Sequence, residues 1–348
     1  MNPYILTILM LGLGLGTTIT FAGSHWLLAW MGLEMNTLAI IPLMAQQHHP
    51  RAAEATTKYF LTQAAAAAML LFASTTNAWL SGQWEIHQMS HPLPVAIITI
   101  ALALKIGLAP FHMWLPEVLQ GLDLTTGLIL STWQKLAPFA LILQLQPINP
   151  MLLTTLGLLS TLVGGWGGLN QTQLRKLLAY SSIAHLGWMI LVLQTAPSLT
   201  FLALLTYFVM TFSTFLVFKI NKATTINALA TSWTKAPVLT SLAPLIFLSL
   251  GGLPPLTGFM PKWLILQELT KQGLAPTATL AALTALLSLY FYLRLSYAMT
   301  LTVSPNNLVG TAPWRFTSLQ SSLPLAITTS ATILLLPLTP AITALLYP

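Results

Sequence analysis

The feature that most constrains this chain is a succession of apolar stretches, each about 20 residues long and separated by short polar or Gly/Pro-containing breaks. We count about eleven of them, and stretches of this length cross a bilayer as helices whose backbone groups are satisfied internally. The sequence therefore predicts an all-α polytopic membrane protein. The expected spans are Pro3 to Ala22, Trp26 to Met44, Tyr59 to Leu80, Leu93 to Leu115, Leu124 to Leu145, Met151 to Leu169, Leu177 to Leu193, Leu199 to Ile220, Pro237 to Leu269, Ala275 to Thr302 and Leu323 to Tyr347.

The composition agrees with a lipid environment. Only 5% of the residues are charged, whereas soluble domains carry about 25%. The net charge of +7 comes from basic residues scattered singly, so it indicates membrane topology and no nucleic-acid partner. The chain has no cysteine, which excludes disulfides and Cys-ligated clusters. Any redox centre of its system is expected in other chains.

The loop charges predict the orientation. With an odd number of spans the termini lie on opposite sides, and Lys271 is the one loop cation on the side opposite the amino terminus. This bias predicts an amino terminus on the inner, matrix or cytoplasmic, face. The first residues, MNPYILTILM, contain no targeting signal. The loop cations on the amino-terminal side are Arg51, Lys58, Arg175, Lys176, Lys219, Lys222, Lys235 and Arg315.

Two spans are interrupted by Gly and Pro. The fourth contains LKIGLAPFHMWLPEVLQG and the ninth contains SLGGLPPLTGFMPKW, and neither forms an unbroken helix. Because spans five apart cross in opposite directions, these breaks favour two inverted five-helix repeats, residues 1–145 and 151–302, with one extra helix in 303–348. The repeat is inferred from hydropathy alone. The alternative is that Gly and Pro only kink helices for packing.

Ionisable side chains deep in four spans are the candidate site: Glu34, Lys105, Lys135 and Lys262. A charge at the bilayer centre costs roughly 2.5 to 3.5 kcal/mol, so such residues are usually buried against partners or water. Lysine suits a proton relay, because loss of solvation favours its neutral form, whereas arginine stays protonated. Glu34 and Lys105 could form a switch, in which pairing holds the proton on the lysine and separation releases it. The alternative is lysines that snorkel to the headgroups or form static ion pairs.

Two histidines are candidate relay residues. His112 follows the first break and His185 lies in the seventh span. Each could bridge lysines through water, and each could equally be a hydrogen-bonded packing residue. His48 and His49 lie in a loop without metal-ligand spacing, so no metal site is predicted. Glu117 and Asp123 are expected in a loop that contacts a neighbouring subunit.

Several segments together resemble a known family. They are FAGSHWLLAWMGLEMNTLAIIPLM, LKIGLAPFHMWLPEV, STWQKLAP, QLRKLLAYSSIAHLGW and GGLPPLTGFMPKW. The likeness covers essentially the whole chain. It is to the second-subunit family of NADH:ubiquinone oxidoreductase, respiratory complex I, in its vertebrate mitochondrially encoded form, an antiporter-like group related to Mrp-type cation/proton antiporters.

The resemblance implies two inverted five-helix bundles in the mitochondrial inner membrane. Glu34 would pair with Lys105 of the first broken helix, Lys135 would be the connecting lysine, and Lys262 would belong to the second broken helix, with His185 on the hydrophilic axis. The chain would help translocate protons while NADH reduces ubiquinone elsewhere in the complex.

The resemblance also implies what surrounds the chain. Its partners would be membrane-arm subunits, including neighbouring antiporter-like ones, and lipids. It would hold no cofactor itself, with FMN, iron–sulfur clusters and ubiquinone in other subunits. Two alternative functions stay open: an autonomous Mrp-like cation/proton antiporter, and a structural membrane subunit without proton transfer.

Overall fold

The computed structural model describes residues 2–46, 49–89, 91–145, 149–234, 236–301 and 323–346. Helices make up most of this part of the chain, and its only extended pairings are two isolated bridges, His25 with Glu85 and Gln173 with Thr225. The prediction of an all-α protein is confirmed. His48, Lys235, Arg315 and most of the expected loop after residue 302 lie outside the described residues.

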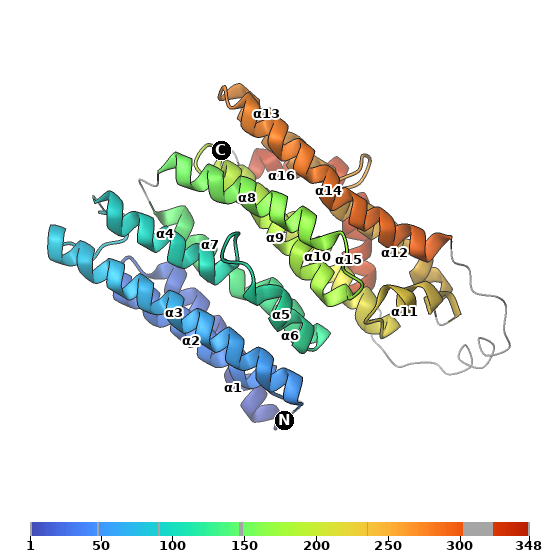
Figure 1. Ribbon diagram of the computed structural model, residues 1–348, viewed down its shortest axis with the longest axis horizontal. Helices are drawn as coiled ribbons and strands as arrows, with labels where there is room; N and C mark the ends of the chain where they lie inside the picture. Colours follow the sequence, from blue (N-terminus) through green and yellow to red (C-terminus); the bar gives the residue numbers. More distant parts are fainter. Residues whose placement is uncertain are drawn as a thin grey trace. The chain divides into compact units, whose positions relative to one another are not determined.

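The chain divides into two compact units, Met1–Leu156 and Gly157–Pro348. In the first unit, α1, α2 and α3 pack side by side, and α3 also contacts α4 and α5 (Figure 1). The helices of this unit are α1 (Pro3–Ala22), α2 (Trp26–Met44), α3 (Pro50–Ser81), α4 (Pro92–Ile106), α5 (Trp114–Gly121), α6 (Leu124–Ser131) and α7 (Trp133–Gln144).

Small residues set the close packing of α1 on α2. A Cβ atom built on Gly16 of α1 would lie 2.8 Å from the carbonyl oxygen of Gly32 in α2, and one built on Gly32 would lie equally close to Gly16. Small residues of this kind let helix backbones approach closely in lipid. Because Asn36 Oδ1 also lies against Gly16, this contact positions a polar side chain one turn beyond Gly32.

The first break lies between α4 and α5. Gly107 ends α4 in the left-handed conformation, with φ of 85°, and its N–H donates to the Ala103 carbonyl. Glycine takes this conformation without steric cost. The peptide bond between Ala109 and Pro110 is cis, and the chain is helical again from Trp114. The predicted fourth span is therefore two half-helices.

The second unit holds the remaining helices. Its core contains α9, α10 and α12, with α14 packed against α12 and α15 against α10. Most of α8 (Pro150–Gly168) also belongs to this unit. The others are α9 (Leu174–Val192), α10 (Pro197–Asn221), α11 (Ile226–Ala230), α12 (Pro237–Gly251), α13 (Phe259–Lys271), α14 (Ala275–Thr300), α15 (Leu323–Leu334) and α16 (Thr339–Leu346).

The second break, between α12 and α13, repeats the pattern of the first. Gly252 ends α12 with φ of 81°, and the bond between Pro254 and Pro255 is cis. Thr257 in the break donates to the Thr332 carbonyl of α15 at 2.6 Å. Both predicted interruptions are therefore present, each between two half-helices.

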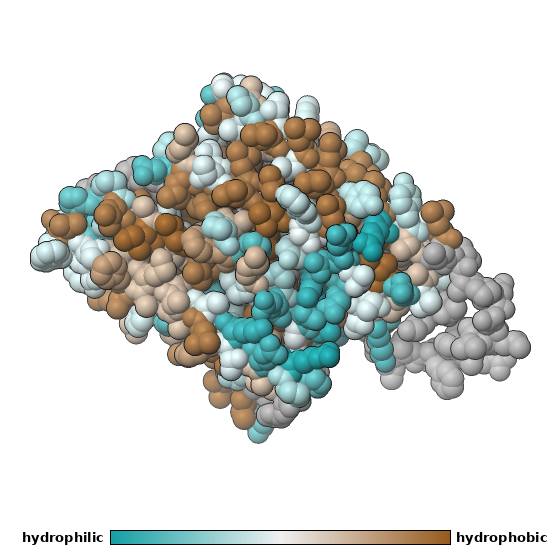
Figure 2. Space-filling view, in the orientation of Figure 1, coloured by the Kyte–Doolittle hydropathy of each residue, from teal (hydrophilic) through white to brown (hydrophobic). Residues whose placement is uncertain are grey.

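Seven described helices, counting α6 and α7 as one, are long and apolar enough to cross a membrane, and the bent pair α15 and α16 would be an eighth. The half-helices α4 and α12 are shorter apolar segments. Large apolar side chains such as Leu11, Trp79 and Leu283 are exposed, and Figure 2 shows apolar residues over much of the visible face. The chain is a multi-pass membrane protein.

Three details differ from the expectations. α3 begins at Pro50, not at Tyr59, because Pro50 occupies its first turn and His49 Nδ1 accepts from the Arg51 N–H. Glu117 lies in α5 and not in a loop. The fifth span is interrupted at Thr132, between α6 and α7, where the sequence offers no Gly or Pro.

Candidate functional site

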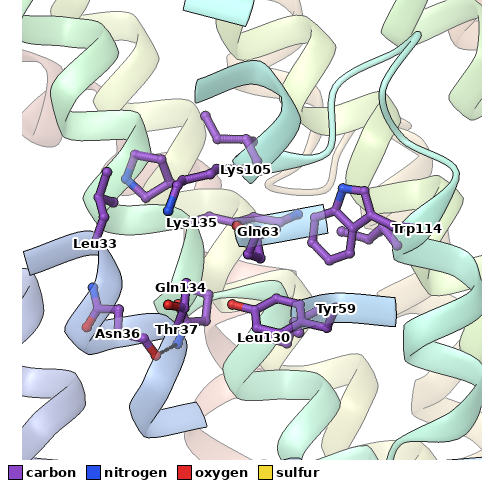
Figure 3. Close-up of a pocket in the computed structure, with 13 residues that line it drawn as sticks. Leu33, Asn36, Thr37, Tyr59, Gln63, Lys105, Trp114, Leu130, Gln134 and Lys135 are labelled. Atoms are coloured by element: carbon purple, nitrogen blue, oxygen red, sulfur yellow. Dashed lines mark hydrogen bonds between the residues drawn. The ribbon is translucent and has the colours of Figure 1, made fainter. Parts of the chain in front are cut away.

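Lys105 and Lys135 line one small cavity inside the first unit. The cavity has a volume of about 20 Å³ and is bounded by α2, α3, α4, α6 and α7 with Trp114 of α5. Lys105 is 6% exposed and Lys135 is 3% exposed. Figure 3 shows that the residues around the cavity, among them Lys105, Lys135, Asn36, Gln63 and Tyr59, come from different helices. Two of the predicted lysines are therefore together, and neither reaches the surface.

The break in α4 positions Lys105. Lys105 lies in the last turn of α4, two residues before Gly107. Leu108 donates to the Ala103 carbonyl, which leaves the Leu104 carbonyl outside the helical ladder. The Trp114 indole Nε1 donates to that carbonyl at 3.0 Å, and the Trp114 ring packs edge-on against Tyr59. Trp114 thus holds the end of α4 next to the lysine.

Lys105 has no direct partner. Its Nζ is buried and makes no hydrogen bond to any described residue. Glu34 interacts with it electrostatically but does not line the cavity, and the two form no ion pair within 4.0 Å. The half-buried Glu34 carboxylate instead accepts a hydrogen bond of 2.6 Å from Thr37 Oγ1. In this conformation Glu34 and Lys105 are close enough to interact electrostatically, but the predicted ion pair is not formed.

Lys262 occupies a different environment in the second unit. Its Nζ donates to the Gly251 carbonyl at 2.8 Å and to the Leu250 carbonyl at 3.4 Å. Both carbonyls end α12, where the helix dipole is negative and a cation is favoured. A Cβ atom on Gly252 would lie 2.8 Å from Lys262 Cδ, so the glycine leaves room for the lysine to cross the helix end.

The two relay histidines are in different surroundings. His185 and Lys262 line one cavity of about 10 Å³, and the His185 ring lies 5.6 Å from the Tyr207 ring. His112 is buried, and its Nδ1 is 3.3 Å from the Pro110 carbonyl oxygen in the first break. The structure therefore brings His185 to a lysine, whereas His112 lines neither lysine cavity.

The carboxamides of the first cavity were not predicted from the sequence. Asn36 is 1% exposed and Gln63 is 3% exposed, and both line the cavity with Lys105. Gln134 lines it as well, and its Nε2 donates to the backbone carbonyl oxygen of Asn36 at 3.1 Å. A lone Gln before the alanine run TQAAAAAM and an Asn two residues after Glu34 were the available signals.

The other ionised residues of interest are outside these cavities. Lys58 of α3 is exposed and forms two ion pairs. Its Nζ lies 2.8 Å from Glu54 Oε1 and 2.7 Å from Glu117 Oε2. Arg294 donates to the Leu169 carbonyl at 2.8 Å, just beyond the end of α8. Within the described ranges no three His, Cys, Asp or Glu side chains are grouped to hold a metal ion.

The family comparisons match this architecture. Residues 23–288 match the family model described as "NADH:quinone oxidoreductase/Mrp antiporter, TM", and residues 289–343 match that for the NADH dehydrogenase subunit 2 C-terminus. The fold also resembles the Mrp complex from Dietzia sp. DQ12-45-1b, with a TM-score of 0.84 at 15% identity over 97% of this chain and 76% of that one. These matches define the class: a helical membrane protein of the antiporter-like group.

Individual relatives define the family. The chain is 76% identical to NADH-ubiquinone oxidoreductase chain 2 of Tetraodon nigroviridis and 74% identical to that of Oncorhynchus mykiss, over 99% of each chain in both cases. A chain of respiratory complex I from Thermus thermophilus superposes with a TM-score of 0.82 at 31% identity, over 96% of this chain and 80% of that one. This protein belongs to the NADH-ubiquinone oxidoreductase chain 2 family.

Proposed function

We propose that this chain is a core membrane-arm subunit of respiratory complex I and that it carries one proton-translocating unit, driven by electron transfer from NADH to ubiquinone elsewhere in the complex. The observation that carries the proposal is the small cavity that Lys105 and Lys135 both line. A buried ammonium without a partner is costly, and such residues within membrane spans commonly mark proton pathways.

The residues have distinct roles in this mechanism. Lys105 holds a proton and exchanges it with Lys135 across the cavity. Glu34 modulates that exchange through its charge, because a carboxylate that approaches an ammonium stabilises it. In the second unit Lys262 and His185 form the corresponding exchange site, with Lys262 held on the end of α12. His112 serves as a relay group in the first break.

We further propose eleven membrane spans arranged as two inverted five-helix repeats, residues 1–145 and 151–302, with one additional helix in 303–348. The two breaks support this arrangement, since each has a left-handed glycine with a proline at the third position after it. The isolated bridges support it too. One joins the residue before the second span to the segment after the third, and the other joins the residue before the seventh span to the segment after the eighth. Residues matched at constant separation are Gly107 with Gly252, Pro110 with Pro255, and Pro116 with Pro261.

The proposed location is the mitochondrial inner membrane, with the amino terminus in the matrix. The curated relatives are chains of NADH-ubiquinone oxidoreductase from fishes, and the excess of loop cations on one side supports the orientation. The proposed partners are neighbouring antiporter-like subunits, other membrane-arm subunits and lipids. FMN, iron–sulfur clusters and ubiquinone would belong to other subunits of the complex.

Substitution of Lys105 tests the function. Lys105→Met in the assembled complex keeps an unbranched side chain of similar size and removes its proton site, so we expect proton pumping to fall by at least tenfold while the amount of assembled complex is unchanged. Pumping into sealed vesicles and native-gel analysis measure the two quantities. Lys58→Met is the matched control, because Lys58 is an exposed lysine of the same unit that does not line the cavity.

The alternatives predict different results. Normal pumping by the assembled Lys105→Met variant would favour a structural subunit. Cation exchange by the purified chain alone, as monomer or homodimer, would favour an autonomous antiporter. Loss of pumping in both lysine variants would mean that the effect is not specific to the cavity.

A further inference from the structure

The second unit contains a large cavity that the proposed function does not use. Its volume is about 200 Å³, against about 20 Å³ for the cavity at Lys105. It lies between α10, the second break and the bent pair α15 and α16, and its apolar wall includes Leu202, Leu205, Leu335 and Ile342. No charged side chain is among the described residues that line it.

The bend between α15 and α16 forms this cavity. Pro337 and Pro340 cannot donate to a helical ladder, so the helix does not continue straight. The two segments meet at 67°, and both pack on α10. Ala331 before the bend and Ile342 after it therefore line the same space.

The few polar groups of the wall are already used. Thr206, Thr257 and Thr339 line the cavity, and their hydroxyl groups donate to backbone carbonyls at 3.0, 2.6 and 2.6 Å. An ordered water needs two to four polar partners, and apolar cavities of about 150 Å³ stay dry and take up apolar molecules. The lining therefore favours a hydrocarbon occupant over water.

The position and length of the cavity indicate which hydrocarbon. It opens on the outer surface of the unit, where Leu205 is 52% exposed, and the medium around membrane spans is lipid. On α10 the lining runs from Leu202 to Val209, about 10 Å of helix at 1.5 Å per residue. A flexible chain fills a space of that length, whereas a single apolar side chain from a neighbour is shorter.

We propose that this cavity binds part of one acyl chain of a membrane phospholipid, which enters beside Leu205 and runs along α10 towards Thr257 in the second break. The chain fills the space that the bend leaves, and so holds α15 and α16 against α10. Thr206 is common to the wall of this cavity and to that of the cavity of His185 and Lys262. The binding site itself does not depend on the proposed function.

Phospholipid with brominated acyl chains is the probe for the first test. The wild-type assembled complex, reconstituted in nanodiscs of dibrominated phosphatidylcholine, should show elongated density with bromine peaks between α10 and α15 in a density map. Separate water-sized peaks, a side chain of a neighbouring subunit in the cavity, or an empty cavity would each overturn the proposal. This measurement needs no variant and so does not depend on whether a substitution is tolerated.

A cavity-filling variant gives the second test. Ala331→Phe places a ring in the space of the acyl chain, so the bromine peaks should disappear from the map. The matched control is Ala326→Phe, because Ala326 is an exposed alanine of the same helix that does not line the cavity. Ala326→Phe should leave the peaks in place, and their persistence in Ala331→Phe would contradict the assignment of the site.

Amide hydrogen exchange measures the stabilising effect of the chain. Removal of lipid by detergent should speed exchange in residues 331–342 of the wild-type complex at least threefold, because the bent pair loses a packing partner, and added phosphatidylcholine should reverse the change. In Ala331→Phe the ring replaces the chain, so lipid removal should have little effect there, whereas Ala326→Phe should respond as the wild type does. Equal sensitivity to lipid in both variants would refute the stabilising role.

These measurements are independent of proton pumping. Bromine density and hydrogen exchange report on the acyl chain alone, so their failure would leave the proposed function intact. Normal pumping by Lys105→Met would refute the proposed function and leave the acyl-chain site standing.

Discussion

At the scale of single residues, the two broken-helix lysines differ in how they are held. Lys262 donates to two carbonyls at the end of α12. In the first break a freed carbonyl at a different position, that of Leu104, accepts from Trp114, and Lys105 is left without a described partner. Lys105 can therefore move to a new partner without breaking a direct hydrogen bond. Lys262 must first break its hydrogen bonds to the carbonyls of α12.

The contact between Gly252 and Lys262 leads to a prediction. Gly252→Ala adds a Cβ atom 2.8 Å from Lys262 Cδ and places alanine at a φ of 81°, a conformation that costs about 1–2 kcal/mol. We expect lower thermal stability and at least a fivefold loss of pumping, because the lysine is pushed off the carbonyls of α12.

Gly273→Ala is the control for backbone strain. Its φ is 75°, but no atom lies within 4 Å of the added Cβ. It should lower thermal stability by a similar amount and leave pumping intact. Equal pumping in the two variants would contradict the positioning of Lys262 by the end of α12.

The candidate lysines could be predicted from the sequence, but their surroundings could not. Lys105 and Lys135 are conspicuous because each lies among apolar residues. Asn36 and Gln63 carry no charge, and a carboxamide in a helix is ordinary unless its neighbours from other helices are known. The open distance between Glu34 and Lys105 also depends on side-chain conformation, since Glu34 bonds to its own helix through Thr37.

At the scale of helices, the ends of the spans followed the apolar pattern closely, because Gly and Pro mark them. α1 and α2 have the expected bounds, Pro3–Ala22 and Trp26–Met44. The error in α3 has a physical cause: hydropathy reports where lipid begins, and the helix continues beyond that point through the more polar residues PRAAEATTK. The break at Thr132 had no sequence signal of this kind.

The packing of α1 against α2 gives a second prediction. Gly16→Ala places a Cβ atom 2.8 Å from the Gly32 carbonyl oxygen and against Asn36, so the helices must separate. We expect a loss of about 1–3 kcal/mol, the usual cost of overpacking, measured as a lower unfolding temperature of the assembled complex.

Gly14→Ala is the control in the same helix. No atom lies within 4 Å of its added Cβ, and alanine is the better helix former by about 1 kcal/mol. It should be neutral or stabilising. A Gly16→Ala variant as stable as Gly14→Ala would show that the backbones do not approach as described.

At the scale of the whole molecule, the absence of cysteine makes the proposed orientation directly measurable. Asn227 in α11 and Gln272 after α13 are exposed and fall on opposite sides of the proposed topology. Asn227→Cys should react with a membrane-impermeant maleimide from the matrix side, and Gln272→Cys from the other side. Labelling of both residues from one side would refute the arrangement.

The lysine-bearing breaks also bear on how this chain tolerates sequence change. At the first break, the Trp114 indole donates a hydrogen bond to a peptide oxygen left free at the end of α4. At the second, the Lys262 ammonium donates to a peptide oxygen at the end of α12. An unbroken α12 would bond those oxygens internally and leave Lys262 nothing to hold. Mutations that improve helical regularity there would consequently strengthen the local fold and remove the anchor of Lys262.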